Sequence, residues 1–301
     1  MSNQVWVCGE VLIDLIPDGV ERKAVVGGGP ANTAKALAKL GIETQFIDGI
    51  STDMYGQMAL KQLHQDGVLL DYVKFSDKPT CLAIVSLNNA GGATYEFLID
   101  GTATFDFTPE WLPNLLEVKP SLLHTGTLVT AIEPAASVLH AWASVVKNIA
   151  PIVFDPNIRP AVMADREEYV RQVERWIAIS SAVKVSDDDI YWLYPGVDLD
   201  QVANKWLSMG PELIVVTFGD KGLTGYRKSE KVAVDAKKVV VADTVGAGDT
   251  VGAILVEAII EDGLDKLTEK RLSVMLDRAA KAAAITVSRT GALPPSKAEI
   301  K

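Results

Sequence analysis

Short apolar runs that alternate with amphipathic stretches are the feature that most restricts the fold of this chain. The runs are rich in β-branched residues and nearly all apolar, which is typical of strands covered on both faces. We expect strands at 5–8, 44–47, 152–154, 183–185 and 213–216, and helices at 30–40, 55–66, 134–148, 167–179 and 200–209. This alternation predicts a layered α/β sheet whose strands are joined by crossover helices.

Two stretches break this rhythm and predict a second, smaller sheet. Residues 11–26 contain the turn Pro17-Asp18-Gly19, and residues 80–99 are typical of a strand, a turn at 88–92 and another strand. We expect these segments to pack beside the main sheet and interpret them as a β-lid, built from about 11–26 and 80–100. The length of 301 residues suits a single catalytic domain, 1–301, that carries this lid.

Composition restricts the partners and the compartment. The formal net charge is −10, so no surplus of basic residues is available to displace the counterions of a nucleic acid. Two cysteines, Cys8 and Cys81, favour a reducing compartment over a disulfide framework. The N-terminus lacks the basic and apolar regions of a signal peptide, and no apolar run is long enough to span a membrane. We therefore expect a cytoplasmic protein.

The segment Gly27-Gly28-Gly29-Pro30-Ala31-Asn32 is the first candidate binding motif. Glycine lets a ligand approach the backbone closely, and proline is well placed in the first turn of a helix. Asn32 would offer a donor and an acceptor from that turn. The same residues also suit a loop that merely needs positive φ angles, and the segment alone does not separate the two interpretations.

The segment Asp243-Thr244-Val245-Gly246-Ala247-Gly248-Asp249 is the second motif, and an apolar helix follows it. A glycine-rich turn that enters a helix presents free N–H groups and the positive end of the helix dipole to an anion. A carboxylate in that turn would repel a phosphate, which suggests that Asp249 acts as a base for a nearby hydroxyl. By itself, Asp249 fits slightly better the common case of an aspartate that stabilises a helix start.

Three further motifs follow predicted strands, at the sheet edge where open α/β proteins bind ligands. The turn at 217–222 suits the approach of a nucleotide but also fits a plain turn. Arg159, in the segment 155–160, could bind an oxyanion with two hydrogen bonds. The acidic run 187–189 would either hold Mg²⁺ through water or cap a short helix at 190–194. The chain has neither a P-loop nor a dinucleotide-binding G-x-G-x-x-G after its first strand.

Taken in order, these motifs resemble those of the ribokinase-like, or PfkB, family of carbohydrate kinases over essentially the whole chain. The segment 27–41 is similar to the first family signature, and 243–249 is similar to the second and more specific one. Within the family, the likeness is greatest to bacterial fructokinases. The resemblance implies a three-layer α/β/α sandwich with a small β-sheet lid, and an ATP-dependent sugar kinase activity.

The resemblance also implies a role for each matching position. Asp249 would be the catalytic base, and the backbone N–H groups of Gly246, Ala247 and Gly248 would form an anion hole for the γ-phosphate, with Arg159 beside them. The sugar would contact Asp14, Gly28, Gly29, Asn32, Phe97 and Arg159. ATP would contact Lys184, Thr217, Gly219, Gly222, Ala280, Ala283 and Ala284, together with Gly246 and Gly248.

Two metal ions are implied in the same way. Asp189 stands where the family often has a longer glutamate, so it would hold Mg²⁺ through water. Oxygens at Asp243, Val245, Thr286 and Gly291 would bind K⁺. The family also expects a small residue where this chain has Ile254, which should affect helix packing rather than catalysis.

The distribution of basic residues bears on the sugar. No lysine or arginine occurs between Lys78 and Lys119, which spans the second lid segment. A phosphorylated or carboxylated sugar would need a cation there, although Arg22, Lys23 and Arg159 remain available. We therefore expect D-fructose, converted to fructose 6-phosphate. Ribose, a nucleoside or 2-keto-3-deoxygluconate are alternatives, as is a sugar or nucleotide sensor without catalysis. The lid sheet could also pair two subunits into a homodimer.

Overall fold

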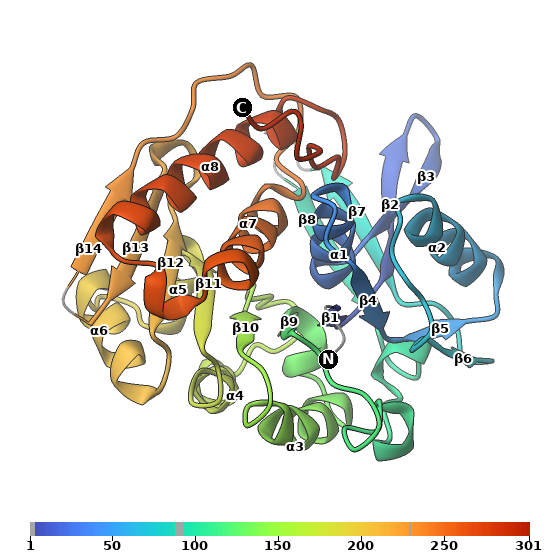
Figure 1. Cartoon of the computed structure of the whole chain (residues 1–301). Coiled ribbons are helices and arrows are strands. Elements are labelled where there is room, and N and C mark those ends of the chain that lie inside the picture. Colours follow the sequence, from blue (N-terminus) through green and yellow to red (C-terminus); the bar gives the residue numbers. More distant parts are fainter. Residues whose placement is uncertain (1–3, 88–92, 229) are drawn as a thin grey trace.

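The computed structural model describes residues 4–87, 93–228 and 230–301. Its largest sheet has eight strands in the order β14-β13-β12-β11-β10-β9-β1-β4 (Figure 1). The strands from β4 to β12 are parallel, and β13 and β14 are antiparallel additions at one edge. Their bounds are β1 Val5–Cys8, β4 Thr44–Ile47, β9 Leu122–Gly126, β10 Ile152–Asp155, β11 Ala182–Ser186, β12 Leu213–Thr217, β13 Leu223–Arg227 and β14 Glu230–Val234. The five predicted strands are confirmed; β9, β13 and β14 were not predicted.

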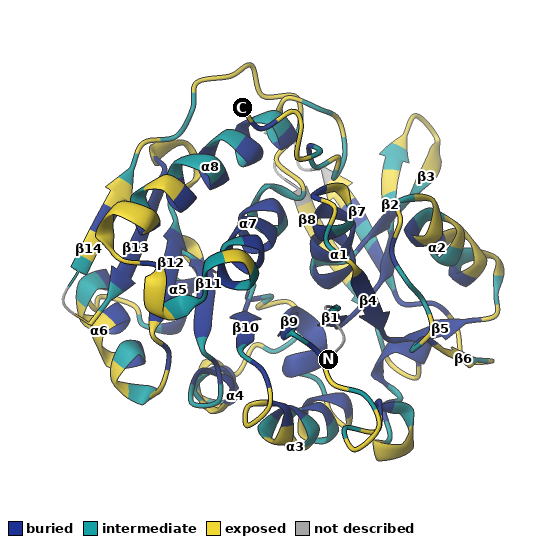
Figure 2. Ribbon diagram, viewed as in Figure 1, coloured by how far each residue is buried: buried dark blue, intermediate teal, exposed yellow. Residues whose placement is uncertain are grey.

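Helices cover both faces of this sheet and complete the predicted three-layer α/β/α sandwich. One face carries α1 (Gly29–Lys39), α7 (Ala247–Asp262) and α8 (Glu269–Val287), and the other carries α3 (Ala135–Val146), α4 (Arg166–Ile177), α5 (Asp187–Leu193) and α6 (Leu199–Met209) (Figure 1). Alternate residues of β1 show the two cores: Val5 and Val7 join one apolar cluster, and Trp6 and Cys8 join the other. The strands from β4 to β12 are therefore largely buried, whereas the edge strand β14 and the outer sides of the helices carry exposed residues (Figure 2).

A four-stranded sheet lies beside the sandwich. It is built from the two segments in which strands and helices do not alternate. Its order is β3-β2-β7-β8, with bounds β2 Leu12–Asp18, β3 Glu21–Gly27, β7 Leu82–Leu87 and β8 Ala93–Leu98. The second sheet is thus confirmed, while the turn predicted at 88–92 lies outside the described residues. The register aligns Asp14 with Ala83 and Ala83 with Phe97. Because paired residues point to the same side of a sheet, Asp14 and Phe97 share one face.

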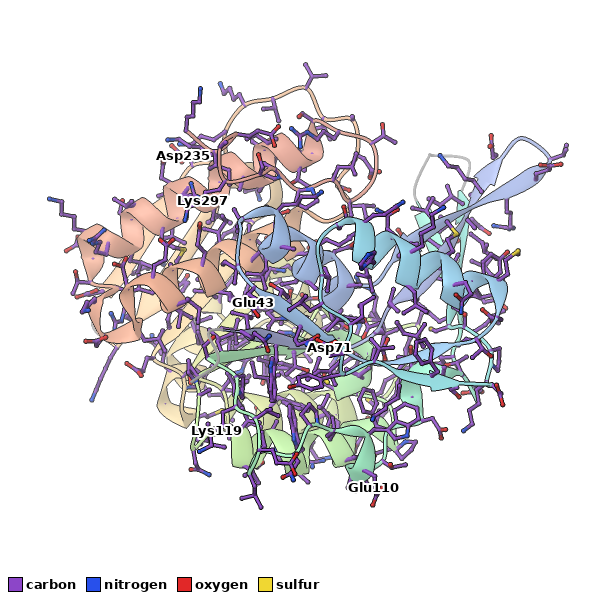
Figure 3. The ribbon with its side chains drawn as sticks, turned by 45° about the vertical axis from the view of Figure 1, so that its right-hand side comes forward. Glu43, Asp71, Glu110, Lys119, Asp235 and Lys297 are labelled. Atoms are coloured by element: carbon purple, nitrogen blue, oxygen red, sulfur yellow. The ribbon has the colours of Figure 1, made fainter. Side chains whose placement is uncertain are left out.

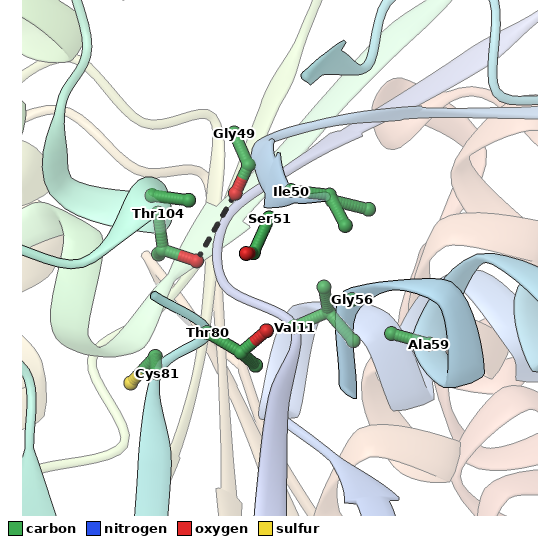
Figure 4. A pocket seen from close by; sticks show the side chains of 10 residues that line it. Val11, Gly49, Ile50, Ser51, Gly56, Ala59, Thr80, Cys81 and Thr104 are labelled. Atoms are coloured by element: carbon green, nitrogen blue, oxygen red, sulfur yellow. Dashed lines mark hydrogen bonds between the residues drawn. The ribbon is translucent and has the colours of Figure 1, made fainter. Parts of the chain in front are cut away.

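Smaller elements complete the fold. They are the pair β5 (Gly49–Ser51) and β6 (Lys74–Ser76), the helix α2 (Met54–Gln65), and the 3₁₀ turns Ala103–Phe105, Pro109–Trp111, Thr127–Thr130, Gly219–Lys221 and Leu264–Lys266. A closed cavity of about 10 Å³ lies between β5, α2 and the start of β7, lined by side chains such as Thr80 and Thr104 (Figure 4). That volume is about the space of one water molecule. Among the described residues, no helix is long and apolar enough to cross a membrane.

Candidate active site

The start of α7 is the centre of the candidate site. Its N-cap, Gly246, has a φ of 81° in the left-handed region, where a residue with a side chain would be strained. No side chain caps this helix end. The first N–H groups of a helix have no partner within the helix, so this end is suited to bind an anion. The predicted anion hole at 246–248 therefore lies at a helix start that no side chain caps, and its binding of a phosphate stays a prediction.

Asp249 lies in the first turn of α7 but makes none of the contacts of a helix cap. Its Oδ2 atom instead accepts a hydrogen bond of 2.9 Å from Asn32 Nδ2, and a side-chain carbon on Gly29 would lie 3.4 Å from Oδ1. Helices α1 and α7 pack directly against each other and so join two motifs that are 217 residues apart (Figure 1). The carboxylate is therefore directed at the start of α1, where the sequence predicts the sugar.

The pKa of Asp249 is suited to accepting a proton near neutral pH. Burial raises this pKa to about 6. The charges of Lys184 and Arg159 and the hydrogen bond from Asn32 act to lower it, but they are outweighed by burial. A carboxylate with a pKa of about 6 is ionised at pH 7 yet is a stronger base than a free aspartate. The site thus places a tuned carboxylate beside a turn that can bind an anion.

A buried ion pair lies beneath the same turn. Lys184 on β11 and Asp155 at the end of β10 are both buried, and Nζ and Oδ2 lie 3.0 Å apart. A side-chain carbon on Gly248 would lie only 2.6 Å from Lys184 Nζ, so the ammonium faces the first turn of α7. Burial lowers the pKa of Lys184, but the charges of Asp155 and Asp249 more than offset it and raise the pKa overall. Lys184 is therefore a permanent cation next to the predicted anion hole.

The segment after β10 lies on the other side of Asp249. Asn157 has a positive φ of 40°, and a carbon on Gly29 would lie 3.0 Å from its Nδ2 atom. The Arg159 guanidinium donates to the carbonyl oxygens of Asn157 and Ile158, at 3.3 and 3.0 Å. Its charge lowers the pKa of both Asp249 and Asp14. The structure thus brings Arg159 within electrostatic reach of both carboxylates.

Asp14 faces this cluster from the small sheet. Burial raises its pKa to about 6, while the charges of Arg159 and Lys35 oppose the shift. Phe97 lies on the same face of that sheet and stacks on Tyr95, with ring centroids 6.1 Å apart. Gly28 is the N-cap of α1, with a φ of 101°. The predicted sugar residues therefore come from the small sheet, the start of α1 and the segment after β10, and their contact with a sugar stays a prediction.

Comparisons with known proteins identify the family of this chain. The family model described as pfkB family carbohydrate kinase matches residues 2–299. The chain belongs to this family. It is 37% identical to a fructokinase of Rhizobium leguminosarum bv. trifolii over 281 residues, which cover 92% of this chain and 85% of that protein. It is also 32% identical to a probable fructokinase-4 of Arabidopsis thaliana, with 97% and 94% of the two chains covered.

Solved structures share the fold over nearly the whole chain. A fructokinase from Xylella fastidiosa with bound ATP aligns with a TM-score of 0.91 at 23% identity, covering 99% of this chain and 96% of that one. A fructokinase from Vibrio cholerae, solved with fructose, ADP and a calcium ion, aligns with a TM-score of 0.88 at 24% identity, covering 99% and 97%. At these identities the structures establish the fold, which is that of the carbohydrate kinase family.

Within this family fold, the predicted nucleotide residues lie on separate elements. Thr217 ends β12, and Gly219 and Gly222 bound the 3₁₀ turn that follows it. On α8, Ala280 and Ala284 are buried and Ala283 is half-buried. Contact of all these residues with ATP stays a prediction.

The oxygens predicted to bind K⁺ are partly brought together. The Asp243 carboxylate accepts hydrogen bonds from the N–H groups of Val245 and Gly291, at 3.1 and 2.8 Å, and so ties their two loops to each other. The Thr286 hydroxyl is buried and shares a hydrogen bond of 2.9 Å with Thr250. The Asp243 carboxylate and the Thr286 hydroxyl are oxygen ligands of the kind that a hard cation takes, so their chemistry fits K⁺, and binding of the ion stays a prediction.

Asp189, the predicted magnesium residue, makes the contacts of a helix cap. Its two carboxylate oxygens accept the N–H groups of Ile158 and Ser186, at 2.9 and 3.3 Å, and the Ser186 hydroxyl accepts from Asp189 N. This reciprocal capping starts α5 at Asp187, three residues before the predicted start. Within 4–87, 93–228 and 230–301, no group of three acidic, histidine or cysteine residues is arranged to hold a metal. A magnesium contact through water stays a prediction.

Some residues of the site were not identified from the sequence. Asn157 lies in the segment 155–160, but its positive φ angle could not be foreseen from the sequence. Lys35, which acts electrostatically on both Asp14 and Asp249, stands three residues after Asn32 and therefore on nearly the same side of α1. A lysine among Ala34, Ala36 and Leu37 was a signal available in the sequence.

Proposed function

We propose that this carbohydrate kinase is an ATP-dependent fructokinase that converts D-fructose to fructose 6-phosphate. The observation that carries the proposal is the Asp249 carboxylate, bonded to Asn32 and placed in the first turn of α7. Several relatives that align with this chain over most of their length are named fructokinases, and these names support fructose as the substrate.

In the proposed reaction, the sugar oxygen attacks the γ-phosphorus of ATP while the bond to the bridging β–γ oxygen breaks and ADP leaves. Asp249 takes the proton of the attacking hydroxyl. The N–H groups of 246–248 would stabilise the developing charge, and each such donor contributes roughly 3 kcal/mol in other enzymes. Lys184 adds a fixed positive charge at the same turn, and Arg159 adds a second. These roles suit phosphoryl transfer, a reaction that depends on positioning and charge stabilisation.

Two metal ions complete the proposal. Mg²⁺ would neutralise charge on the phosphates of ATP, and Asp189 would act on it only through water. K⁺ would bind the oxygens of the loops that Asp243 joins, next to the anion hole, because Ala292 of the second loop packs against Gly246.

The contacts of the arginines support a neutral sugar. The Arg22 guanidinium donates to the carbonyl oxygens of Leu15 and Val85, at 3.0 and 2.6 Å, so it is tied to the small sheet. Arg159 donates to its own segment. Asp14 adds a negative charge on the sugar side, which would disfavour a phosphorylated or carboxylated substrate. A hydroxyl-rich sugar that donates to Asp14 and Asn32 fits these groups better.

We further propose that residues 1–301 act as one catalytic domain and that the four-stranded sheet acts as its lid. Closure of this sheet over the sugar would exclude water and limit idle hydrolysis of ATP. The exposed side chains Ile16, Tyr95 and Leu98 on the sheet would allow a homodimer through it. The free, buried cysteines Cys8 and Cys81 fit a cytoplasmic enzyme.

A coupled assay of ADP release on a panel of sugars tests the proposal. We expect turnover with fructose at least ten times higher in kcat/KM than with ribose, a nucleoside or 2-keto-3-deoxygluconate. Preference for one of those sugars would replace fructose and leave the kinase intact. Binding of sugars without any sugar-dependent turnover would instead show a sensor and refute the enzymatic proposal.

A further inference from the structure

Glu10 is a buried carboxylate at the junction between the sandwich and the small sheet. It is 2% exposed and lies in the segment 9–11, which joins the end of β1 to the start of β2. A buried carboxylate is costly unless hydrogen-bond donors surround it. The Thr127 hydroxyl donates to Glu10 Oε1, and Val129 N donates to Oε2 at 3.4 Å. Both donors belong to the 3₁₀ turn after β9, so Glu10 ties the start of the small sheet to this turn.

Thr127, the first residue of this turn, has an unusual backbone conformation beside the candidate active site. Its φ is 59°, in the left-handed region, which is unfavourable for a β-branched residue. Such conformations persist only where their surroundings hold them, and they are concentrated at functional sites. A side-chain carbon on Gly29 would lie 2.9 Å from Thr127 Cγ2 and 3.4 Å from Asp249 Oδ1. The Thr127 methyl group and the Asp249 carboxylate therefore border the same position of α1.

The main chain around Glu10 also lies against the start of α1. A side-chain carbon on Gly28 would lie only 2.5 Å from the Glu10 carbonyl oxygen, and one on Gly9 would lie 2.3 Å from Pro30 Cγ. Glycine permits this close approach of two backbone segments. Glu10 thus reaches the start of α1 in two ways, directly through its main chain and indirectly through Thr127.

The electrostatic surroundings of Glu10 overlap with those of the site. Burial raises the pKa of Glu10 to about 7, while its two hydrogen bonds and the charge of Arg159 act to lower it. The charge of Arg159 also acts to lower the pKa of Asp14 and of Asp249. Because both carboxylate oxygens of Glu10 accept bonds from the turn after β9, this residue is suited to position other groups rather than to react.

We propose that Glu10 is a positioning residue of the sugar site, which acts through Thr127 on Gly29 and so fixes the start of α1 relative to Asp249. The inference rests on the reaction proposed above, in which Asp249 takes a proton from a sugar held at the start of α1. Without the bond to Glu10, the turn 127–130 would relax and its methyl group would shift against Gly29. A displacement of about 1 Å in a positioning group can lower a rate about a hundredfold.

Three substitutions in the full chain separate the parts of this link. Thr127→Val removes the hydroxyl and keeps the branched shape against Gly29. Thr127→Ser keeps the hydroxyl and removes the methyl group. Glu10→Gln keeps the size of the side chain, but its amide nitrogen is a donor, so it can accept only one of the two hydrogen bonds. The double variant Glu10→Gln/Thr127→Val shows whether the two side chains act as one unit.

Two neighbouring residues at the opposite edge of the large sheet supply matched controls. Glu43, labelled in Figure 3, precedes β4, is exposed and accepts a bond of 2.6 Å from Gln4. Thr44 is buried and donates its hydroxyl to the carbonyl oxygen of Ile42 at 2.9 Å. Glu43→Gln therefore controls for the loss of a carboxylate, and Thr44→Val controls for the loss of a threonine hydroxyl.

Steady-state kinetics with fructose and with ATP give the decisive comparison. We expect kcat/KM for fructose to fall about ten- to hundredfold in Glu10→Gln and Thr127→Val, with the KM for ATP within about twofold of the wild type. Thr127→Ser should lose less than Thr127→Val. The double variant should lose no more than about the worse single variant, because both substitutions break the same link. Both controls should match the wild type.

Four outcomes would overturn the inference. These are normal fructose kinetics in folded Glu10→Gln, equal losses for fructose and ATP, losses that multiply in the double variant, and a loss in Thr127→Ser as large as in Thr127→Val. The last comparison decides the matter even if Glu10→Gln does not fold. A role in stability alone would lower the melting temperature and leave the fructose kinetics of the folded enzyme unchanged.

The inference and the proposed function fail in distinguishable ways. If the wild type prefers another sugar of the panel, that sugar replaces fructose, and the ratio between wild type and variant still tests Glu10. Isothermal titration of the same sugar in the presence of a non-hydrolysable ATP analogue needs no turnover. We expect binding to weaken at least about threefold in Glu10→Gln. Unchanged sugar affinity in this variant would refute the positioning role whatever the kinase assay shows.

Discussion

Helices α5 and α7 each carry an aspartate at the third position of their first turn, and the two aspartates do different things. In α5, Ser186 is the N-cap, and Asp189 turns back to bond Ser186 N and Ile158 N. In α7, the N-cap is Gly246, which has no side chain, and Asp249 bonds Asn32 on another helix. With a serine at the N-cap, the carboxylate three residues later is held in the reciprocal hydrogen bonds that cap the helix. With a glycine at the N-cap, neither the carboxylate nor the first N–H groups have such a partner, so both are available for a substrate.

Replacing each aspartate with asparagine should give the largest expected effect and should distinguish the roles of Asp249 and Asp189. Asp249→Asn keeps an acceptor for Asn32 but cannot take a proton, so we expect turnover to fall by at least about a hundredfold, with ATP affinity nearly unchanged. Its thermal stability should not fall, because the carboxylate it replaces is disfavoured by burial. Asp189→Asn should chiefly lower the unfolding free energy, by about 1–2 kcal/mol, since it removes a charged acceptor from two buried N–H groups.

Steady-state kinetics, nucleotide binding and chemical denaturation of both variants check this pair. Near-normal turnover in Asp249→Asn would mean that the carboxylate is not the base. A hundredfold loss of turnover in Asp189→Asn, restored by excess Mg²⁺, would mean that α5 serves the metal after all and that the comparison is wrong.

The second prediction concerns the open start of α7. Gly248→Ala would place a carbon 2.6 Å from Lys184 Nζ, which forces the ammonium or the helix turn to move. Displacement of one charge-stabilising group by such a distance should lower kcat by about tenfold to a hundredfold, with a smaller change in the KM for sugar. Gly252→Ala is the matched control in the same helix, because its new carbon would meet its nearest atom, His124 Nε2, at an ordinary 3.6 Å.

We expect Gly252→Ala to retain activity and to gain up to about 1 kcal/mol of stability, the usual benefit of alanine over glycine in a helix. Equal kinetic losses in the two variants would indicate a general effect on α7. Only a loss confined to Gly248→Ala supports a role for the Lys184 contact.

The third prediction follows from the pKa of Asp249, which burial raises to about 6. A base works only when it is ionised, so kcat/KM for the sugar should be constant above this pH. Protonation of Asp249 alone should lower it about tenfold for each pH unit below this pKa, and the limb of the wild type should be steeper where Asp14 is also protonated. Asp14 has a raised pKa of about 6 as well, so both carboxylates contribute to the profile of the wild type.

Asp14→Asn removes one of these two titrations. If Asp249 is the base, the acid limb should persist in this variant with a slope of one. A flat profile in Asp14→Asn between pH 5 and 7, measured as kcat/KM, would assign the limb to the small sheet rather than to α7.

The layered fold could be predicted because its strands are continuous apolar runs, and the strands that were missed lack that pattern. Strand β9 carries His124 and Thr125, which are polar yet buried in the sheet. Strand β13 contains Gly225, and β14 begins with the charged residues Glu230 and Lys231 at the edge of the sheet. Burial of polar side chains depends on tertiary neighbours, which local sequence patterns do not reveal.

The candidate site was predicted only in part, because some of its contacts also depend on tertiary packing. The glycine turn of α7 and the Asn32 motif are both local, and each could be recognised on its own, but their contact depends on the packing of α1 on α7. Asp189 shows the opposite case, because Ser186 three residues before it already favours a capping box. Lys35 was overlooked because its proximity to Asp14 and Asp249 arises only in the folded chain.

The smallest expected effect tests the cap itself. Ser186→Ala removes the hydroxyl that accepts from Asp189 N at 3.0 Å, and we expect the unfolding free energy to fall by about 1 kcal/mol, as for other N-cap serines. Turnover per folded molecule should stay within about twofold of the wild type, since this hydroxyl only starts a helix. Urea denaturation and activity measured on the same preparation check both parts. Because the Asp189 bond to Ile158 N also supports the segment that carries Arg159, a Ser186→Ala enzyme with normal stability but raised sugar KM would show that the cap positions the site rather than stabilises the fold.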